Sequence, residues 1–261
     1  ADELVQIRGG RGFETAASQR ARGERGIEAE QVLRDLRIMR IFEGSTEIMH
    51  LLIAREAVDA HLAVAGDIID PEASREDKIK AVAKAGAFYA TWLPTLVAGK
   101  GAVPTSFAEF GPLAAHVRYL ERTTRKLARS IFYGMGRWQG AMERKQAFLG
   151  RVVDIGAELF AMTAACLRAK AERAEHPEGV ELADLFCQQA RVRIGALFTA
   201  LWENTDDADD DAAKKVLAGR YTFLEGGIVL PSDEGPWVSP VVAGPSAKPD
   251  VRRHLPQPGG R

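Results

Sequence analysis

The sequence predicts an all-α protein built as a helical bundle. Apolar residues recur every three or four positions over long segments, which is the pattern of a helix with one buried face. No proline occurs between Leu113 and His176, so that stretch lacks the residue that most often breaks a helix. No segment alternates apolar and polar residues over a length useful for a β-strand.

Prolines, glycines and turn-forming residues divide the chain into the expected helices. These cover residues 45–66, 72–92, 113–139, 141–174 and 181–201, and a last short helix falls within 214–230. Asp70-Pro71 and His176-Pro177 mark turns, and residues 93–112, rich in glycine and proline, form a long connection. We expect the acidic run at residues 206–211 to be a solvated loop, because the glycine and closing glutamate of a calcium-binding loop are missing.

The expected helix at residues 141–174 carries the clearest core stripe. Its apolar members are Phe148, Val152, Ile155, Leu159, Met162, Ala165, Cys166 and Ala169. Because Cys166 lies on this stripe, we expect it to pack in the core rather than act as a nucleophile. The five histidines have no ligand spacing with one another or with the two cysteines, so a metal site is not expected.

Composition argues against several classes of partner. The chain has 261 residues, of which 46% are hydrophobic, enough for one large domain or two smaller ones. The formal net charge of −1 gives no electrostatic reason to expect nucleic acid or an anionic membrane. Two cysteines favour a reducing cytoplasm, and no apolar run approaches the length that spans a bilayer. The chain begins without a methionine or a helix cap, as if cut from something longer.

A glycine-rich turn follows a short apolar segment at residues 4–13. Gly9, Gly10 and Gly12 allow positive φ angles and leave backbone N–H groups free to face an anion such as a pyrophosphate. Two alternatives exist: a plain helix C-terminal turn, which this segment alone favours, and an RNA-binding RGG segment, which is normally repeated. Residues 14–31, polar and rich in arginine, are expected to form an exposed loop or a loose helix.

Residues 34–56 hold the most conspicuous feature, a corner between two amphipathic helical patterns. Gly44 and Ser45 suit the start of the second helix, and Glu47 then sits in the first turn, where a carboxylate suits the helix dipole. Glu43 lies at the corner beside Phe42. A carboxylate held against apolar side chains can have a raised pKa and act as a base, whereas on spacing alone a solvated cap is the commoner role.

Two motifs resemble the C-terminal signature of the acyl-CoA dehydrogenase family. The first is QIRGGRGF at residues 6–13, and the second is LRDLRIMRIFEGSTEI at residues 33–48. The helical pattern from residue 143 onward resembles, more loosely, the extra C-terminal region of the very-long-chain type. The resemblance implies the end of the family's C-terminal bundle in residues 1–66, an additional helical domain in 67–230 and a Pro/Gly-rich tail in 231–261.

The same resemblance implies an FAD-dependent reaction. Glu43 would remove the α-proton of a fatty acyl-CoA while FAD takes hydride from the β-carbon, giving a trans-2-enoyl-CoA in β-oxidation. Phe42 and Gly44 would lie against the substrate. The residues implied to contact FAD are Gln6, Ile7, Arg8, Gly9, Gly10, Ser45, Thr46 and Glu47. Because the first five would touch an FAD held mainly by a neighbouring subunit, a homodimer or larger assembly is expected, with electron-transfer flavoprotein as the acceptor.

The resemblance also implies that this chain lacks the N-terminal and middle domains of the family, so that it should be inactive without them. Two other interpretations stay open. An acyl-CoA oxidase would use the same base but pass electrons to oxygen, and a helical assembly or membrane-associating module would need no catalysis. The apolar loop at residues 93–110 is the candidate for peripheral membrane contact, although a buried contact is the more usual fate. A cytoplasmic location, with membrane association as a further option, is expected.

Overall fold

The computed structural model describes residues 1–70 and 72–225. All regular secondary structure in these residues is helical, which confirms the all-α prediction. Within the same residues, no helix combines the length and apolar character needed to cross a membrane. Pro71, expected to mark a turn, and the expected tail at residues 231–261 lie outside the described residues.

The chain separates into two compact units, residues 1–204 and 205–261. The helices of the first unit are α1 (Asp2–Arg8), α2 (Gly10–Phe13), α3 (Ala16–Ala21), α4 (Ala29–Ile38), α5 (Thr46–Ile69), α6 (Arg75–Thr95), α7 (Ala114–Trp138), α8 (Gln146–Ala171) and α9 (Gly179–Ala200). Short 3-10 turns η1 (Lys100–Ala102), η2 (Ala108–Leu113) and η3 (Gln139–Arg144) flank α7. The five long helices predicted from spacing are thus confirmed. The boundary expected after residue 66 falls inside α5, and the three-part division stays a prediction.

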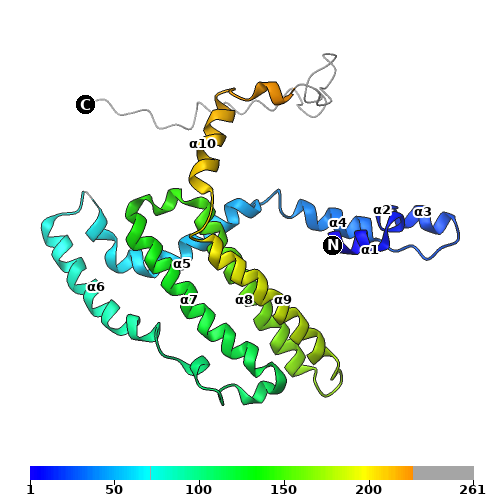
Figure 1. Ribbon diagram of the computed structural model, residues 1–261, viewed down its shortest axis with the longest axis horizontal. Helices are drawn as coiled ribbons and strands as arrows, with labels where there is room; N and C mark the ends of the chain where they lie inside the picture. The colour runs from blue at the N-terminus through cyan, green and yellow to red at the C-terminus, as the bar shows by residue number, and fades with distance from the viewer. Residues whose placement is uncertain (71, 226–261) are drawn as a thin grey trace. The chain divides into compact units, whose positions relative to one another are not determined.

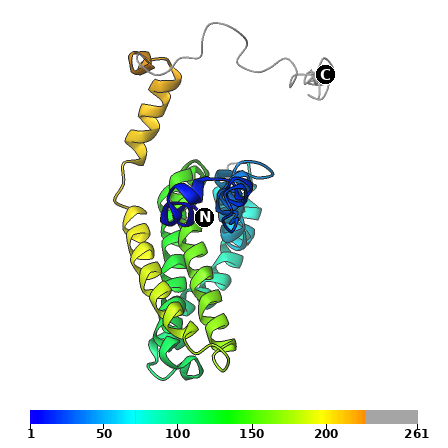
Figure 2. The same ribbon diagram turned by 90° about the vertical axis from the view of Figure 1, so that its right-hand side faces the viewer.

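The core of the first unit lies between α8 and its neighbours. Helix α8 packs against α5, α7 and α9, and α5 also packs against α6 (Figures 1 and 2). The predicted α8 stripe is confirmed as the buried face, with Phe148, Ile155 and Met162 almost fully enclosed. Burying each such side chain contributes about 1.5–3 kcal/mol.

Cys166 and Cys187 meet in this core. Both thiols are buried, and their Sγ atoms are 3.6 Å apart across the α8–α9 contact. The prediction that Cys166 is a packing residue is therefore confirmed. On the adjoining face of α9, Asp184 Oδ1 lies 2.8 Å from Nε2 of the buried His116, which ties α9 to the start of α7.

The connection between α6 and α7 lies along α7 because arginines of that helix bind its backbone. The guanidinium groups of Arg129, Arg122 and Arg118 donate to the carbonyls of Leu96, Gly101 and Ser106, respectively. A Cβ atom at Gly101 would lie 2.7 Å from the Arg118 carbonyl oxygen, so close contact requires glycine there. Leu96 is buried whereas Val97 is exposed, so the apolar residues of this connection are only partly covered.

Five rings pack together where α5, α6 and α7 meet. His61 of α5 is 6% exposed and contacts Phe88, Tyr89, Trp92 and Phe132. Its Nδ1 lies 3.2 Å from the Tyr89 hydroxyl. Burial lowers the pKa of His61 and raises that of Tyr89, since both charged forms lose hydration there.

Acid is therefore expected to destabilise the protein through His61. In the unfolded chain a histidine takes up a proton near pH 6.5, whereas folded His61 resists protonation, so unfolding is favoured as pH falls through that value. The urea midpoint should fall between pH 7.5 and pH 5.5, and this fall should shrink in His61→Gln. The exposed His176 supplies the control, because His176→Gln should retain the wild-type fall. An identical pH dependence in wild type and His61→Gln would contradict the assignment.

The second unit contains α10 (Asp206–Leu217) and the 3-10 turn η4 (Thr222–Glu225). The prediction of an acidic loop at residues 206–211 is wrong, because these residues form the first half of α10. Asp206, Asp207 and Asp209 lie in the first turn, where negative charge is stabilised by the helix dipole. Lys214 and Lys215 pair one turn later with Asp210 and Asp211 at 2.6 and 2.7 Å. The helix expected within residues 214–230 consequently begins earlier and ends at Leu217.

Candidate active site

The corner predicted from the sequence lies between α4 and α5. Helix α4 ends at Ile38, whose carbonyl accepts from the backbone N–H groups of Ile41 and Phe42 at 2.9 and 3.2 Å. Arg40 then closes the loop onto the start of α5. Its carbonyl accepts from the Thr46 N–H at 3.3 Å, and its Nε lies 3.4 Å from Thr46 Oγ1. The residues from Ile41 to Ser45 are therefore held in a short loop closed at both ends.

Glu43 occupies an unusual backbone conformation in this loop. Its φ angle is +55°, a left-handed value that costs a residue with a side chain about 1–2 kcal/mol. Gly44 follows with φ +105°, where a Cβ atom would lie 2.9 Å from Met49 Sδ. Strain of this kind persists where the surroundings enforce it, and it concentrates at functional sites.

The side chains around Glu43 are apolar but open to solvent in this chain. Phe42 is 50% exposed, and Glu43 itself is exposed. The prediction that Glu43 lies beside apolar side chains therefore holds for its sequence neighbours. The described residues do not enclose the Glu43 carboxylate.

Apolar side chains extend from this corner along both helices. The exposed ones on α4, the loop and the first half of α5 are Val32, Leu36, Ile38, Met39, Ile41, Phe42, Ile48, Met49, Leu52 and Ile53. We call this set the corner surface. A concentration of large apolar side chains in one region is typical of a surface that another polypeptide covers.

Ser45, Thr46 and Glu47 form the start of α5, as predicted. Ser45 is the N-cap residue, but its side chain makes no capping bond to the first-turn N–H groups. The pKa of Glu47 is lowered because its carboxylate accepts hydrogen bonds from its own backbone N–H and from Ser45, with smaller contributions from Arg40 and His50. Glu47 therefore carries negative charge throughout the neutral range.

The predicted glycine-rich turn separates α1 from α2, which confirms the interpretation as a helix C-terminal turn. Gly9 has φ +58°, so it uses the positive φ that glycine allows, whereas Gly10 and Gly12 lie within α2 and do not. Gln6, Ile7 and Arg8 end α1, and Ile7 is 81% exposed. Arg8 Nε is buried and has no hydrogen-bond partner among the described residues.

The structure thus places the predicted site residues in two groups. The first group lies at the α4–α5 corner and contains Phe42, Glu43, Gly44, Ser45, Thr46 and Glu47. The second group lies at the α1–α2 turn and contains Gln6, Ile7, Arg8, Gly9 and Gly10. Helices α1 and α2 both pack against α4, the helix that leads into the corner. The two groups are therefore linked through α4.

Sequence reasoning missed Gln19, which ties the end of α2 to the segment that leads into α4. Residues 14–31, expected to be an exposed loop or loose helix, contain α3 and a fully buried Gln19. Its Nε2 donates to the carbonyls of Arg11 and Glu14 at 2.7 and 3.1 Å, and its Oε1 accepts from the Ile27 N–H at 3.2 Å. A single polar residue in a polar segment gives no periodic signal, so no pattern could have identified it.

Replacing Gln19 by Leu is expected to lower the free energy of unfolding by about 2–3 kcal/mol, because three hydrogen bonds made by a fully buried amide are lost. Urea denaturation measures the loss, and hydrogen exchange at the Ile27 amide reports it locally. Gln31 is exposed, and its side chain donates to Asp35 one turn away, so Gln31→Leu should change stability by less than about 0.5 kcal/mol. Equal effects of the two substitutions would contradict the role of Gln19.

Comparison with known proteins identifies the first part of the chain. Residues 1–58 match the family described as acyl-CoA dehydrogenase, C-terminal domain. The probable acyl-CoA dehydrogenase FadE10 of Mycobacterium tuberculosis is 59% identical over 259 residues, which cover 97% of this chain and 40% of that protein. The chain is homologous to the C-terminal part of acyl-CoA dehydrogenases. The corner and the glycine-rich turn both fall within the matched residues.

The rest of the chain also aligns with acyl-CoA dehydrogenases. The mitochondrial very-long-chain specific enzyme of Homo sapiens is 29% identical over 246 residues, 90% of this chain and 34% of that protein. The corresponding enzyme of Bos taurus is 28% identical over 239 residues, 89% of this chain and 34% of that protein. The chain therefore spans less than half the length of these acyl-CoA dehydrogenases, and the similarity to the very-long-chain enzymes extends well beyond α5.

Proposed function

We propose that this chain is the C-terminal part of an FAD-dependent acyl-CoA dehydrogenase of fatty acid β-oxidation that acts on long or bulky acyl chains. The supporting observation is the left-handed Glu43, followed by Gly44, in a closed loop among exposed apolar side chains. A carboxylate held in a strained, fixed position can be aimed at one proton of a substrate.

Glu43 is the base in this proposal. It takes the α-proton of an acyl-CoA thioester, and the product is a trans-2-enoyl-CoA. Gly44 has no side chain, so its backbone can lie close to the acyl chain beside the carboxylate. Phe42 and its apolar neighbours exclude water from the proton transfer once the corner surface is covered.

The residues of both groups fit a flavin dinucleotide. The first-turn N–H groups of α5 are not capped by the Ser45 side chain, and such groups suit a phosphate or ribose oxygen. At the α1–α2 turn, the buried Nε of Arg8 lacks a partner among the described residues, and a Cβ at Gly9 or Gly10 would meet no atom. In our proposal Ser45, Thr46 and Glu47 hold one part of FAD, and the five residues of the turn hold its adenine end. FAD, when bound, accepts the hydride from the substrate β-carbon.

The exposed apolar side chains of the corner surface support the proposal that this chain works together with a further polypeptide. We propose that the N-terminal part found in the relatives covers it, within a homodimer or larger assembly that passes electrons to electron-transfer flavoprotein. The cytoplasm is the proposed compartment, with peripheral membrane contact as a further option.

Purification of this chain together with the N-terminal part tests the proposal. Intact mass spectrometry should find both parts in one complex, and the absorbance spectrum should show bound flavin. The reduced flavin should react slowly with air in a dehydrogenase and rapidly in an oxidase. A colourless complex would overturn the proposed flavin site, whereas flavin binding without acyl-CoA turnover would overturn the proposed reaction.

A further inference from the structure

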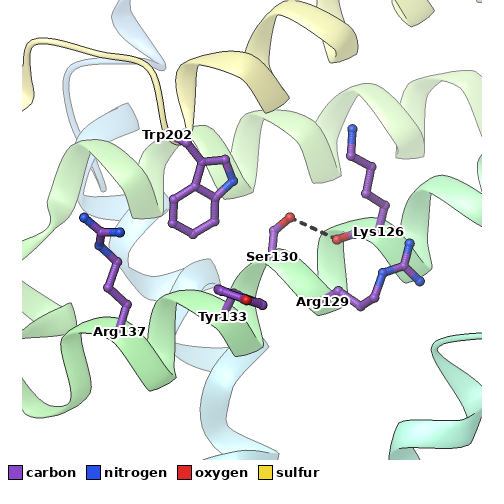
Figure 3. A pocket seen from close by; sticks show the side chains of 6 residues that line it. All are labelled: Lys126, Arg129, Ser130, Tyr133, Arg137 and Trp202. Atoms are coloured by element: carbon purple, nitrogen blue, oxygen red, sulfur yellow. Dashed lines mark hydrogen bonds between the residues drawn. The ribbon is translucent and has the colours of Figure 1, made fainter.

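A second groove lies between α7 and the residues that follow α9, and none of its lining residues belongs to the candidate active site. Its volume is about 540 Å³, within the range of small-molecule sites. The lining residues are Lys126, Arg129, Ser130, Tyr133, Arg137 and Trp202 (Figure 3).

The groove is strongly basic in a chain whose net charge is −1. Among the described residues that line it, three side chains are cationic and none is a carboxylate. Lys126 Nζ lies 4.0 Å from the centre of the Phe198 ring, and the Arg137 guanidinium lies 5.8 Å from that of Trp138. Arg129 donates to the Leu96 carbonyl. Aromatic faces and a carbonyl thus position these cations without neutralising them, so the groove attracts anions.

Two exposed rings occupy the middle of the groove. Tyr133 is 73% exposed and Trp202 is 43% exposed, and their centroids are 6.5 Å apart at an interplanar angle of 79°. Trp202 stacks on Trp138 at 5.8 Å and contacts the buried Phe148, so its ring is fixed in place. Figure 3 shows the rings between Arg137 on one side and Lys126 with Arg129 on the other. A rigid ring platform between cations favours a ligand that combines a planar ring with negative charge.

We propose that this groove binds a nucleoside phosphate, with the base against Tyr133 and Trp202 and the phosphates at Lys126 and Arg129. Arg137 bounds the opposite end of the groove. Both halves of the ligand are needed, since the cations recognise only charge and the rings recognise only a planar face. The proposal is independent of Glu43 and of the flavin site.

Isothermal titration calorimetry of the full chain with ADP tests this site. ADP should bind saturably, and inorganic pyrophosphate and adenosine should each bind about tenfold more weakly or less, because each supplies one half of the recognition. Tyr133→Ala and Lys126→Gln should each weaken ADP binding about tenfold. Phe160→Ala, which removes an exposed ring of α8 outside the groove, should leave the affinity unchanged.

Three outcomes would overturn the proposal. The first is the absence of ADP binding, and the second is pyrophosphate binding as tight as that of ADP, which would indicate charge attraction alone. The third is ADP binding that Tyr133→Ala does not alter, as expected if ADP occupied the α1–α2 turn instead. Melting curves of each variant show whether the fold is retained, and Tyr133 is exposed enough that its removal should not disturb the core.

Discussion

In the enzyme assembled from this chain and the N-terminal part of its relatives, Glu43→Gln is expected to lower kcat by about a thousandfold. The amide keeps the shape of the carboxylate but cannot accept the substrate α-proton, and loss of a positioned base typically costs 10²- to 10⁴-fold. FAD content should stay unchanged, because Glu43 lies in the loop before the helix start proposed to hold the flavin. Steady-state turnover with an artificial electron acceptor measures the effect.

Glu56→Gln is the matched control for this prediction. Glu56 is an exposed residue of α5, ten positions or more beyond the corner loop, and it takes no part in the proposed site. Its substitution should leave kcat within a factor of about two of the wild-type value, as is usual for surface positions. Turnover of Glu43→Gln at the wild-type rate would show that the corner has another role, as in a helical assembly module.

Gly44→Ala is expected to lower kcat by about a hundredfold while the protein still folds. At φ +105° an alanine is strained, and its Cβ would lie 2.9 Å from Met49 Sδ. The flexible Met49 side chain can move aside, but the loop must also relax, and this displaces the adjacent Glu43. A shift of about 1 Å in a catalytic group can cost about 10²-fold in rate.

Gly66→Ala is the control for the glycine effect. Gly66 lies inside α5 with helical geometry, and a Cβ there would meet no atom within 4 Å. Alanine should therefore stabilise the helix by about 0.5–1 kcal/mol and leave turnover unchanged. If Gly44→Ala keeps wild-type turnover, the loop geometry is not what positions Glu43.

The long helices could be predicted from the sequence because burial of one face imposes a regular spacing. Phe148, Ile155 and Met162 recur at seven-residue intervals on α8, and that pattern alone marks the core. The loop predicted at the acidic start of α10 is wrong because that prediction considered the number of aspartates but not their place at a helix N-terminus. Aspartates crowded at a helix N-terminus are stabilised by its dipole, so Asp206 and Asp207 begin a helix instead of extending a loop.

The sequence could predict which residues form the site, but not their backbone angles and contacts. The motif around Glu43 marks the corner, whereas the left-handed φ of Glu43 depends on how Arg40 and Thr46 close the loop. Gln19 gave no signal, because a buried glutamine is distinguished only by the backbone groups it reaches. The corner surface depends on which helices pack nearby, which no local pattern specifies.

Rapid anaerobic mixing of the assembled enzyme with a long-chain acyl-CoA tests the central claim most directly. The wild type should lose the absorbance of oxidised flavin in a single fast phase, and Glu43→Gln, with the same amount of bound FAD, should bleach about a thousandfold more slowly. Equal bleaching rates for the two proteins would show that another group removes the α-proton, and the role assigned to Glu43 would be wrong.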